Sequence, residues 1–239
     1  MSLGQQKLLA AGLIVCVLTL PFALFVAPAD AVQGEAQRLM YLHVPAAWSA
    51  FLCFGAVLVA SLRHLFIRRE GPWVLARAAA EAGVILTGLT LLTGSLWGAL
   101  TWGTWWAWDA RVITTVAMGL VYVVYLAVSG LVRDRRGRQL ASVIGIVGFL
   151  TVPLVHFSVL WWRTLHQPPT ILAPSLSPPI DPLMGVALAA ALLGFTLLTA
   201  GAVSYRAVAL RAVAAEGTTV TVSERETPAN ATGRELMRR

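Results

Sequence analysis

Six separate stretches of this chain are apolar enough and long enough to cross a lipid bilayer as helices. An α-helix rises about 1.5 Å per residue, so about 20 apolar residues cross the roughly 30 Å hydrocarbon core. The stretches run from Leu8 to Ala27, Val44 to Ile67, Ala78 to Leu96, Val112 to Val132, Leu140 to Leu160 and Leu183 to Tyr205. We therefore predict an all-α integral membrane protein with six transmembrane helices. Pro21 and Pro153 are expected to kink the first and fifth of them.

The overall composition agrees with this class. Hydrophobic residues make up 58% of the chain and charged residues 12%, which excludes an ordinary soluble domain. The net charge of +7 would also suit a nucleic-acid-binding protein, but membrane proteins concentrate Lys and Arg in short cytoplasmic loops because of how they insert. We attribute the charge to topology and expect membrane lipid, not nucleic acid, as the surrounding partner.

The basic residues lie in alternate connections between the predicted helices. One set of connections holds Lys7, Arg63, Arg68, Arg69, Arg77, Arg133, Arg135, Arg136, Arg138, Arg206 and Arg211. The other set, residues 30–43, 97–111 and 161–182, holds only Arg38, Arg111 and Arg163. The positive-inside rule then predicts that both termini are cytoplasmic and that the second set of connections faces outward.

We divide the chain into a six-helix membrane domain, residues 1–206, and a flexible cytoplasmic tail, residues 207–239. From Ala212 the sequence turns polar and cannot bury a core. Ala29-Asp30-Ala31 imitates a signal-peptidase site, but the apolar run before it is too long for a typical signal peptide. We therefore expect the first helix to be retained.

The sequence offers no catalytic constellation. Cys16 and Cys53 lie inside predicted helices and form no Cys-x-x-Cys pattern. The outward connections contain no acid pair and no Ser or Cys beside a His, and no nucleotide-binding fingerprint is present. We expect that the protein is not an enzyme. We also expect Glu81, about one turn inside the third helix, to be tolerated there rather than functional.

Tryptophan is unusually dense between the third and fourth predicted helices, in WGALTWGTWWAWDAR, residues 97–111. The tryptophans are Trp97, Trp102, Trp105, Trp106 and Trp108. An aromatic belt at the membrane interface would explain one or two of them. Five within about three helical turns favour a binding surface for a broad, planar, apolar ligand, because indole rings offer large flat faces at little entropic cost.

Two of the four histidines lie at the same predicted membrane depth as these tryptophans. His43 begins the second helix at its outer end, and His166 follows the fifth helix on the same side. Either alone would be read as a polar interfacial residue, but two neutral imidazoles beside a planar ligand are what six-coordinate haem requires. We expect His64 on a solvated, charged face and His156 as a hydrogen-bonded histidine nearer the bilayer centre.

Three segments carry a resemblance to a known family. WGTWWAWDAR resembles the tryptophan-rich WWD signature of the haem-handling protein superfamily of cytochrome c maturation. YLHVPAAW and SVLWWRTLHQP resemble the flanking histidine motifs of its six-helix family, haem exporter protein C (CcmC). The motifs occur in the family's order between Arg38 and Pro168. The chain departs from the pattern at Leu160, where an acid is common, and at Arg163, where Asn is common.

The resemblance implies that His43 and His166 ligate the iron of non-covalently bound haem b. It further implies that the WWD segment holds the ring, through Trp102, Gly103, Trp105, Trp106, Trp108 and Asp109. Arg38 and Arg111 are candidate partners for the haem propionates, whose charge would otherwise oppose burial. We expect Asp109 to orient Arg111 or a backbone N–H group rather than to contact haem.

The family resemblance also implies a location and partners. These are the bacterial cytoplasmic (inner) membrane, a periplasmic haem chaperone (CcmE-like), ABC transporter subunits (CcmA/CcmB-like) and a small single-helix subunit (CcmD-like). We predict that the chain binds haem at the outer face and presents it to the chaperone. Two alternatives stay open: a membrane b-type cytochrome, which would need a second histidine pair such as His64 and His156, and a haem permease, which would need an inward-facing site.

Overall fold

The computed structural model describes residues 2–67, 70–132, 134–167 and 180–226. Its helices are α1 (Leu3–Pro21), η1 (Phe22–Val26), η2 (Glu35–Leu39), α2 (Met40–Ile67), α3 (Glu70–Trp102), α4 (Ala110–Leu131), α5 (Arg135–Gly148), α6 (Thr151–Trp161) and α7 (Pro182–Glu226). Together they form six spans long and apolar enough to cross a membrane, which confirms the predicted fold class.

Two of the spans are interrupted close to a proline. The first continues past Pro21 as a π-helical turn, η1, and the fifth is divided into α5 and α6 around Phe149 and Leu150. Proline lacks the backbone N–H that an α-helix uses for its hydrogen bond to residue i−4. Pro153 therefore cannot donate to the carbonyl of Phe149, which accounts for the change of helix at this point.

The last helix is longer than the sequence indicated. The last apolar stretch was predicted to end near Tyr205, but α7 continues to Glu226. The division into a membrane domain, residues 1–206, and a cytoplasmic tail stays a prediction. The residues that follow Arg206 include a run rich in Ala, Leu and Arg, all strong helix formers. Residues 227–239 of the predicted tail lie outside the described residues.

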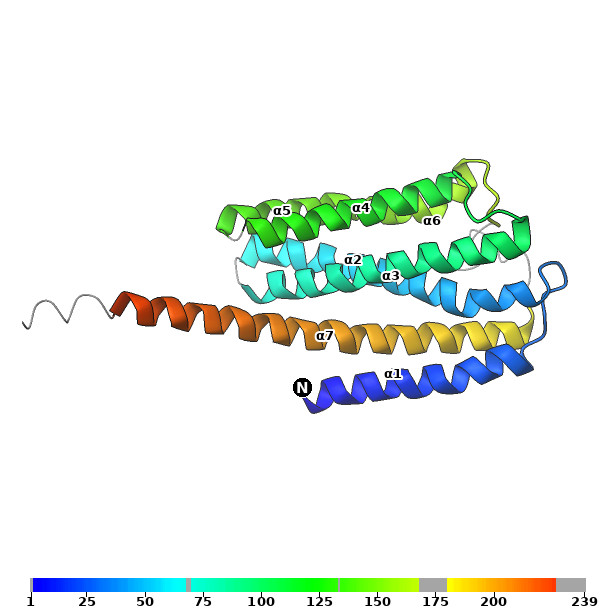
Figure 1. The fold of residues 1–239 in the computed structure, drawn as a ribbon, viewed down its shortest axis with the longest axis horizontal. Helices are drawn as coiled ribbons and strands as arrows, with labels where there is room; N and C mark the ends of the chain where they lie inside the picture. Colours follow the sequence, from blue (N-terminus) through cyan, green and yellow to red (C-terminus); the bar gives the residue numbers. More distant parts are fainter. Residues whose placement is uncertain (1, 68–69, 133, 168–179, 227–239) are drawn as a thin grey trace, which may run out of the picture.

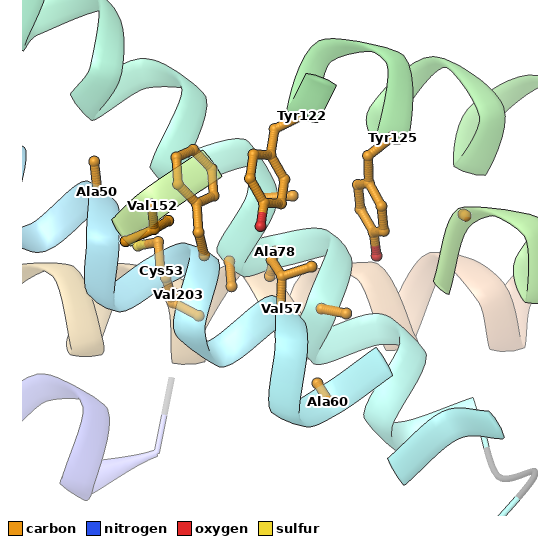
Figure 2. Packing of buried hydrophobic residues seen from close by; sticks show 14 of the residues in the cluster. Ala50, Cys53, Val57, Ala60, Ala78, Tyr122, Tyr125, Val152 and Val203 are labelled. Atoms are coloured by element: carbon orange, nitrogen blue, oxygen red, sulfur yellow. The ribbon is translucent and has the colours of Figure 1, made fainter. Parts of the chain in front are cut away.

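The helices are arranged in layers (Figure 1). α4, α5 and α6 lie on one side of the crossed pair α2 and α3, while α7 and then α1 lie on the other. The principal core fills the space between α2, α3 and α4, where Tyr122 and Tyr125 of α4 point toward α2 and α3 (Figure 2). The Phe54 and Tyr122 rings stack there, with centroids 3.7 Å apart and planes 7° from parallel.

Small residues let the helices approach closely. A Cβ on Gly83 would lie 2.5 Å from the Phe54 ring, so α3 accommodates the core aromatic side chain of α2 through this glycine. Between α1 and α7, a Cβ on Gly12 would lie 2.6 Å from the backbone nitrogen of Leu198, and a Cβ on Gly201 would lie 2.8 Å from Leu9. Close backbone approach at small residues is how helices associate in lipid, where apolar burial supplies little drive.

Two ionisable groups at the end of the bundle far from the tryptophan-rich segment, Glu81 and His64, pack against other parts of the bundle. Glu81 ion-pairs with Arg77 of its own helix at 3.3 Å and with Arg206 of α7 at 2.6 Å. His64 is buried, so the expectation of a solvated face was wrong. His64 follows Val57 and Ser61 at helical spacing on the face of α2 that packs into the bundle, and both of those residues are fully buried.

Candidate functional site

One cavity gathers most of the residues singled out in the sequence. It lies between α2, α3, α4 and α6. Six of the predicted site residues line it, namely His43, Trp102, Trp105, Trp106, Arg111 and His166. It continues along the helices to Phe51, Thr87, Met118 and His156. Trp108 and Asp109 instead line a second, more open pocket together with Trp162 and Arg163.

The tryptophan-rich segment is a turn between two helices. α3 ends at Trp102, and Gly103 has a φ of 70°, in the left-handed region that glycine adopts without strain. Asp109 then starts α4, because its side-chain Oδ1 accepts a hydrogen bond from the Val112 backbone N–H at 3.0 Å. The turn leaves Trp105 65% exposed and Trp108 73% exposed, so apolar aromatic surface faces outward next to the cavity.

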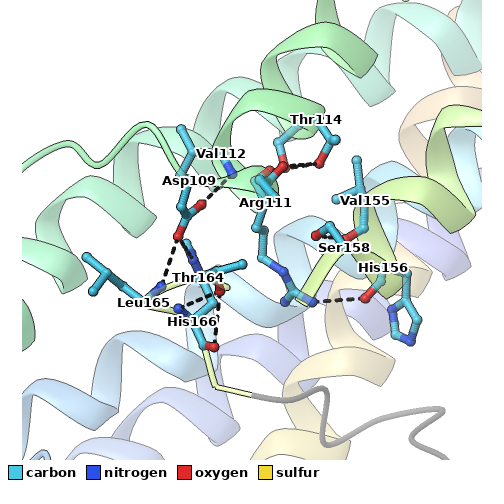
Figure 3. A network of polar contacts seen from close by, with 12 residues as sticks. Asp109, Arg111, Val112, Thr114, Val155, His156, Ser158, Thr164, Leu165 and His166 are labelled. Carbon is cyan, nitrogen blue, oxygen red and sulfur yellow. Dashed lines mark hydrogen bonds and ion pairs between the residues drawn. The ribbon is translucent and has the colours of Figure 1, made fainter. Parts of the chain in front are cut away.

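His166 is held by Asp109 (Figure 3). Its Nδ1 lies 2.8 Å from Asp109 Oδ2, and the same oxygen accepts a hydrogen bond from the Leu165 backbone N–H at 3.3 Å. The Trp102 ring meets the imidazole edge-on, with centroids 4.9 Å apart. Asp109 thus joins the start of α4 to the loop after α6.

This arrangement bears on the expected partners of Asp109. Of the two partners that we considered, the backbone N–H group is present, at Val112. Among the described residues, however, the second oxygen of Asp109 bonds the His166 ring and the Leu165 backbone rather than the guanidinium of Arg111. The helix cap holds Oδ1 of the carboxylate, so that Oδ2 faces the loop that carries His166.

His43 is positioned by α3. Its Nδ1 lies 3.1 Å from the Thr93 hydroxyl oxygen, and that hydroxyl donates its hydrogen to the Leu89 carbonyl at 2.8 Å. When the Thr93 hydroxyl directs its one hydrogen to the Leu89 carbonyl, its oxygen accepts from His43, and the tautomer that matches this pattern carries its proton on Nδ1. The Trp97 ring lies edge-on to His43, at 5.6 Å between centroids, and a Cβ on Gly94 would lie 2.9 Å from its Cε1.

Both imidazoles therefore have Nδ1 engaged by the protein. This is the usual arrangement of a metal-binding histidine, in which the second nitrogen is fixed by a hydrogen bond. Burial lowers the pKa of His166 from its ordinary value, although Asp109 acts in the opposite direction. His166 is consequently neutral near pH 7, which is the form that binds metals.

Asp109 keeps its negative charge in this setting. Burial on its own would raise the pKa of the Asp109 carboxyl group, but the hydrogen bond from Val112 and the proximity of His166 hold that pKa below its ordinary value. The side chain is 9% exposed, so little water competes for its oxygens.

The two arginines that we considered as propionate partners have different positions. Arg111 lines the cavity, donates to the His156 carbonyl at 3.0 Å, and has a buried Nε for which the described residues supply no hydrogen-bond acceptor. Arg38 is absent from the cavity lining: it donates to the carbonyls of Ala23 and Ala27, the latter at 3.0 Å, and ion-pairs with Glu35. Arg38 therefore caps the end of the first span.

Two residues of the site escaped the sequence analysis. Thr93 and Gly94 sit side by side in an apolar stretch of α3, where a threonine and a glycine are ordinary helix-packing residues. Their only signal is that both fall on the same face as Trp97, within one turn. Gly103 is in the predicted segment but serves the turn, not the cavity wall.

Comparison with known proteins decides the family. The family model described as "Heme exporter protein C" matches residues 3–221. The chain belongs to the haem exporter protein C family. This confirms the resemblance found in the three sequence motifs.

Individual relatives of this family cover part of the chain. Heme exporter protein C of Escherichia coli (strain K12) is 39% identical over 176 residues, which are 73% of this chain and 70% of that protein. Heme exporter protein C of Bradyrhizobium diazoefficiens is 42% identical over 147 residues, 61% of this chain and 56% of that protein. A putative cytochrome c biosynthesis ccmC-like mitochondrial protein of Arabidopsis thaliana is 35% identical over 168 residues, 70% of this chain and 63% of that protein.

Proposed function

We propose that this chain binds haem b at the outer face of the membrane and presents it to a periplasmic haem chaperone during cytochrome c biogenesis. One observation carries the proposal: His43 and His166, far apart in the sequence, line one cavity, and the protein engages Nδ1 of each ring. We assign Nε2 of each ring to the iron. The names of the relatives, heme exporter and cytochrome c biosynthesis protein, support it.

The residues of the cavity fit haem chemically. Haem, when bound, supplies an iron with two axial positions and two propionate groups. Two neutral imidazoles suit the axial positions, and the aromatic lining suits the ring. Arg111 brings a cation into this lining with a buried Nε that has no acceptor among the described residues, so it is the base we assign to a propionate. Arg38, which we also considered for a propionate, is less suited to this role because it donates to the Ala27 carbonyl at the end of the first span.

Presentation follows from what these side chains do. His43 and His166 would hold the iron of bound haem from both sides, and an iron held in this way would have no open position for oxygen chemistry, so these residues suit binding rather than turnover. Trp105 and Trp106 are 65% and 38% exposed, so one wall of the site is at the molecular surface. An acceptor protein could therefore reach an edge of bound haem from this wall.

The partners and orientation belong to the same proposal. The charge bias of the connections favours cytoplasmic termini and an outward cavity in the bacterial inner membrane. We assign the acceptor to a CcmE-like haem chaperone. The CcmA/CcmB-like transporter subunits and the CcmD-like single-helix subunit complete the expected assembly.

A membrane b-type cytochrome is the less favoured alternative. It would need a second pair of histidines placed for electron transfer. His156 lines the same cavity as His43 and His166, whereas His64 is buried near the opposite end of α2. His64 and His156 therefore do not line one cavity as a second pair of haem ligands would, and a single haem fits the described residues better.

Ligand substitution with chemical rescue tests the proposal. In purified protein, His43→Gly or His166→Gly should reduce haem measured as the pyridine haemochrome, and added imidazole should restore a six-coordinate spectrum because it fills the open iron position. His64→Gln, in the same membrane bundle but outside the cavity, is the control and should keep the wild-type spectrum. Wild-type spectra from both glycine variants would overturn the assignment.

A further inference from the structure

The two imidazoles of the cavity are held by chemically different partners. His166 Nδ1 lies 2.8 Å from the carboxylate oxygen of Asp109, while His43 Nδ1 lies 3.1 Å from the hydroxyl oxygen of Thr93. A hydrogen bond to an ionised acceptor is shorter and about twice as strong as one between neutral groups. It also makes the opposite ring nitrogen a better electron donor to a metal.

We infer that Asp109 is a positioning residue that acts through His166, making it the stronger iron ligand and leaving His43 as the exchangeable one. The inference rests on the proposed function, since it concerns the same haem site. It assigns to the acid of the WWD segment an electronic role on the iron, in place of contact with the ring.

Asp109 is built into the fold in a way that suits this role. Its Oδ1 is fixed by the Val112 N–H at the start of α4, so the carboxylate cannot turn away from the loop. Its Oδ2 receives both the Leu165 N–H and the His166 ring. The side chain is 9% exposed, and a charge-assisted bond shielded from water keeps more of its strength.

Thr93 gives His43 orientation without charge. The Thr93 hydroxyl donates to the Leu89 carbonyl, so it offers the imidazole only a neutral oxygen lone pair. Gly94 and the Trp97 ring fix the same imidazole sterically. His43 is thus well placed but receives no anionic support, which makes it the ligand that an incoming acceptor side chain displaces first.

The experiment compares Asp109→Asn with two matched variants in the purified, haem-loaded protein. Asn caps helices as well as Asp does, so α4 keeps its start. Asp181→Asn is the control, because Asp181 caps α7 through Leu183 in the same way and contacts no histidine in the described residues. Thr93→Val removes the neutral partner of His43. The readouts are the haem reduction potential and the rate of haem loss to excess apomyoglobin.

We expect Asp109→Asn to raise the reduction potential, because losing the carboxylate weakens donation to oxidised iron, and to speed haem loss about 10- to 100-fold. Thr93→Val should have the smaller effect on both quantities, and Asp181→Asn should match the wild type. Equal effects of Asp109→Asn and Thr93→Val would overturn the inference.

A rescue series shows whether Asp109 acts through His166. 1-Methylimidazole ligates iron but has no N–H to donate, so it cannot bond a carboxylate as His166 does. In His43→Gly loaded with this ligand, Asp109→Asn should still raise the potential; in His166→Gly loaded with it, the shift should vanish. A shift of equal size in both backgrounds would mean that Asp109 acts otherwise. Absence of a bis-imidazole spectrum in the wild type would instead count against the proposed function.

Discussion

Gly94 in α3 faces the imidazole of His43 in α2 so closely that a Cβ at this position would lie 2.9 Å from Cε1 and 3.4 Å from Nδ1. The hydroxyl oxygen of the neighbouring Thr93 lies 3.1 Å from that Nδ1. α3 therefore determines where the His43 ring lies and supplies a hydrogen-bond partner for its Nδ1. The imidazole comes from one helix and its position is set by another.

A side chain at Gly94 should accordingly disturb the site without disturbing the membrane fold. Gly94→Leu would push the His43 ring from its position, and we expect haem content to fall about tenfold or more. The pyridine haemochrome of purified protein measures this. Gly88→Leu is the matched control on the same helix, because a Cβ at Gly88 meets nothing within 4 Å. Equal haem loss in the two variants would contradict the prediction.

The tryptophan wall should behave differently from the histidines. Replacing Trp105 and Trp106 together by Ala removes stacking surface worth about 2–4 kcal/mol in aggregate, and a small ligand cannot replace that surface. Haem should stay low, with or without added imidazole. Trp161→Ala removes a similarly exposed indole outside the cavity lining and should leave haem content unchanged. Recovery of the double variant by imidazole would show that the wall does not hold the ring.

The ion pairs of Glu81 should contribute to stability and not to haem binding. Glu81→Gln leaves Arg77 and Arg206 without their carboxylate, and at 23% exposure for Glu81 we expect a cost of about 1–2 kcal/mol in the free energy of unfolding. Thermal unfolding in detergent should show a lower Tm with an unchanged haem spectrum. Glu35→Gln breaks a pair whose acid is 72% exposed and should change the Tm little. A Tm for Glu81→Gln as high as that of Glu35→Gln would contradict this.

Reporter fusions test the orientation on which the periplasmic assignment depends. A fusion at Arg136, at the start of α5, should report the cytoplasm, and a fusion at Gly103, between α3 and α4, should report the periplasm. A cytoplasmic signal from Gly103 would put His43, His166 and the tryptophans on the wrong side for a periplasmic acceptor.

The features of this structure that depend on residues close together in the chain could be predicted from sequence. Apolar length fixes each span, and a proline removes one particular helix bond, so the six spans and the break near Pro153 follow from local rules. The placement of His43 and His166 at one end of the bundle follows from counting spans between them. Their membership of one cavity then needs only that the two helix ends come together.

Contacts between distant segments were the parts that could not be predicted. Arg38 is bound to carbonyls of the first span, because the turn after that span brings it back to the helix end. Asp109 meets His166 only because the loop after α6 folds over the start of α4. His64 sits in a basic stretch of sequence, yet the helical spacing from Val57 and Ser61 turns it inward. Charge composition alone does not reveal such pairings.

The glycine contacts between α1 and α7 bear on how the chain is made. α1 leaves the ribosome well before α7, and the partner surface for Gly12 is supplied by Leu198 near the middle of the last span. Until then α1 remains in the bilayer as an isolated helix, stable there because its backbone bonds are satisfied internally. Docking of the earliest span onto the latest one can therefore occur only after every helix that lines the cavity has been inserted.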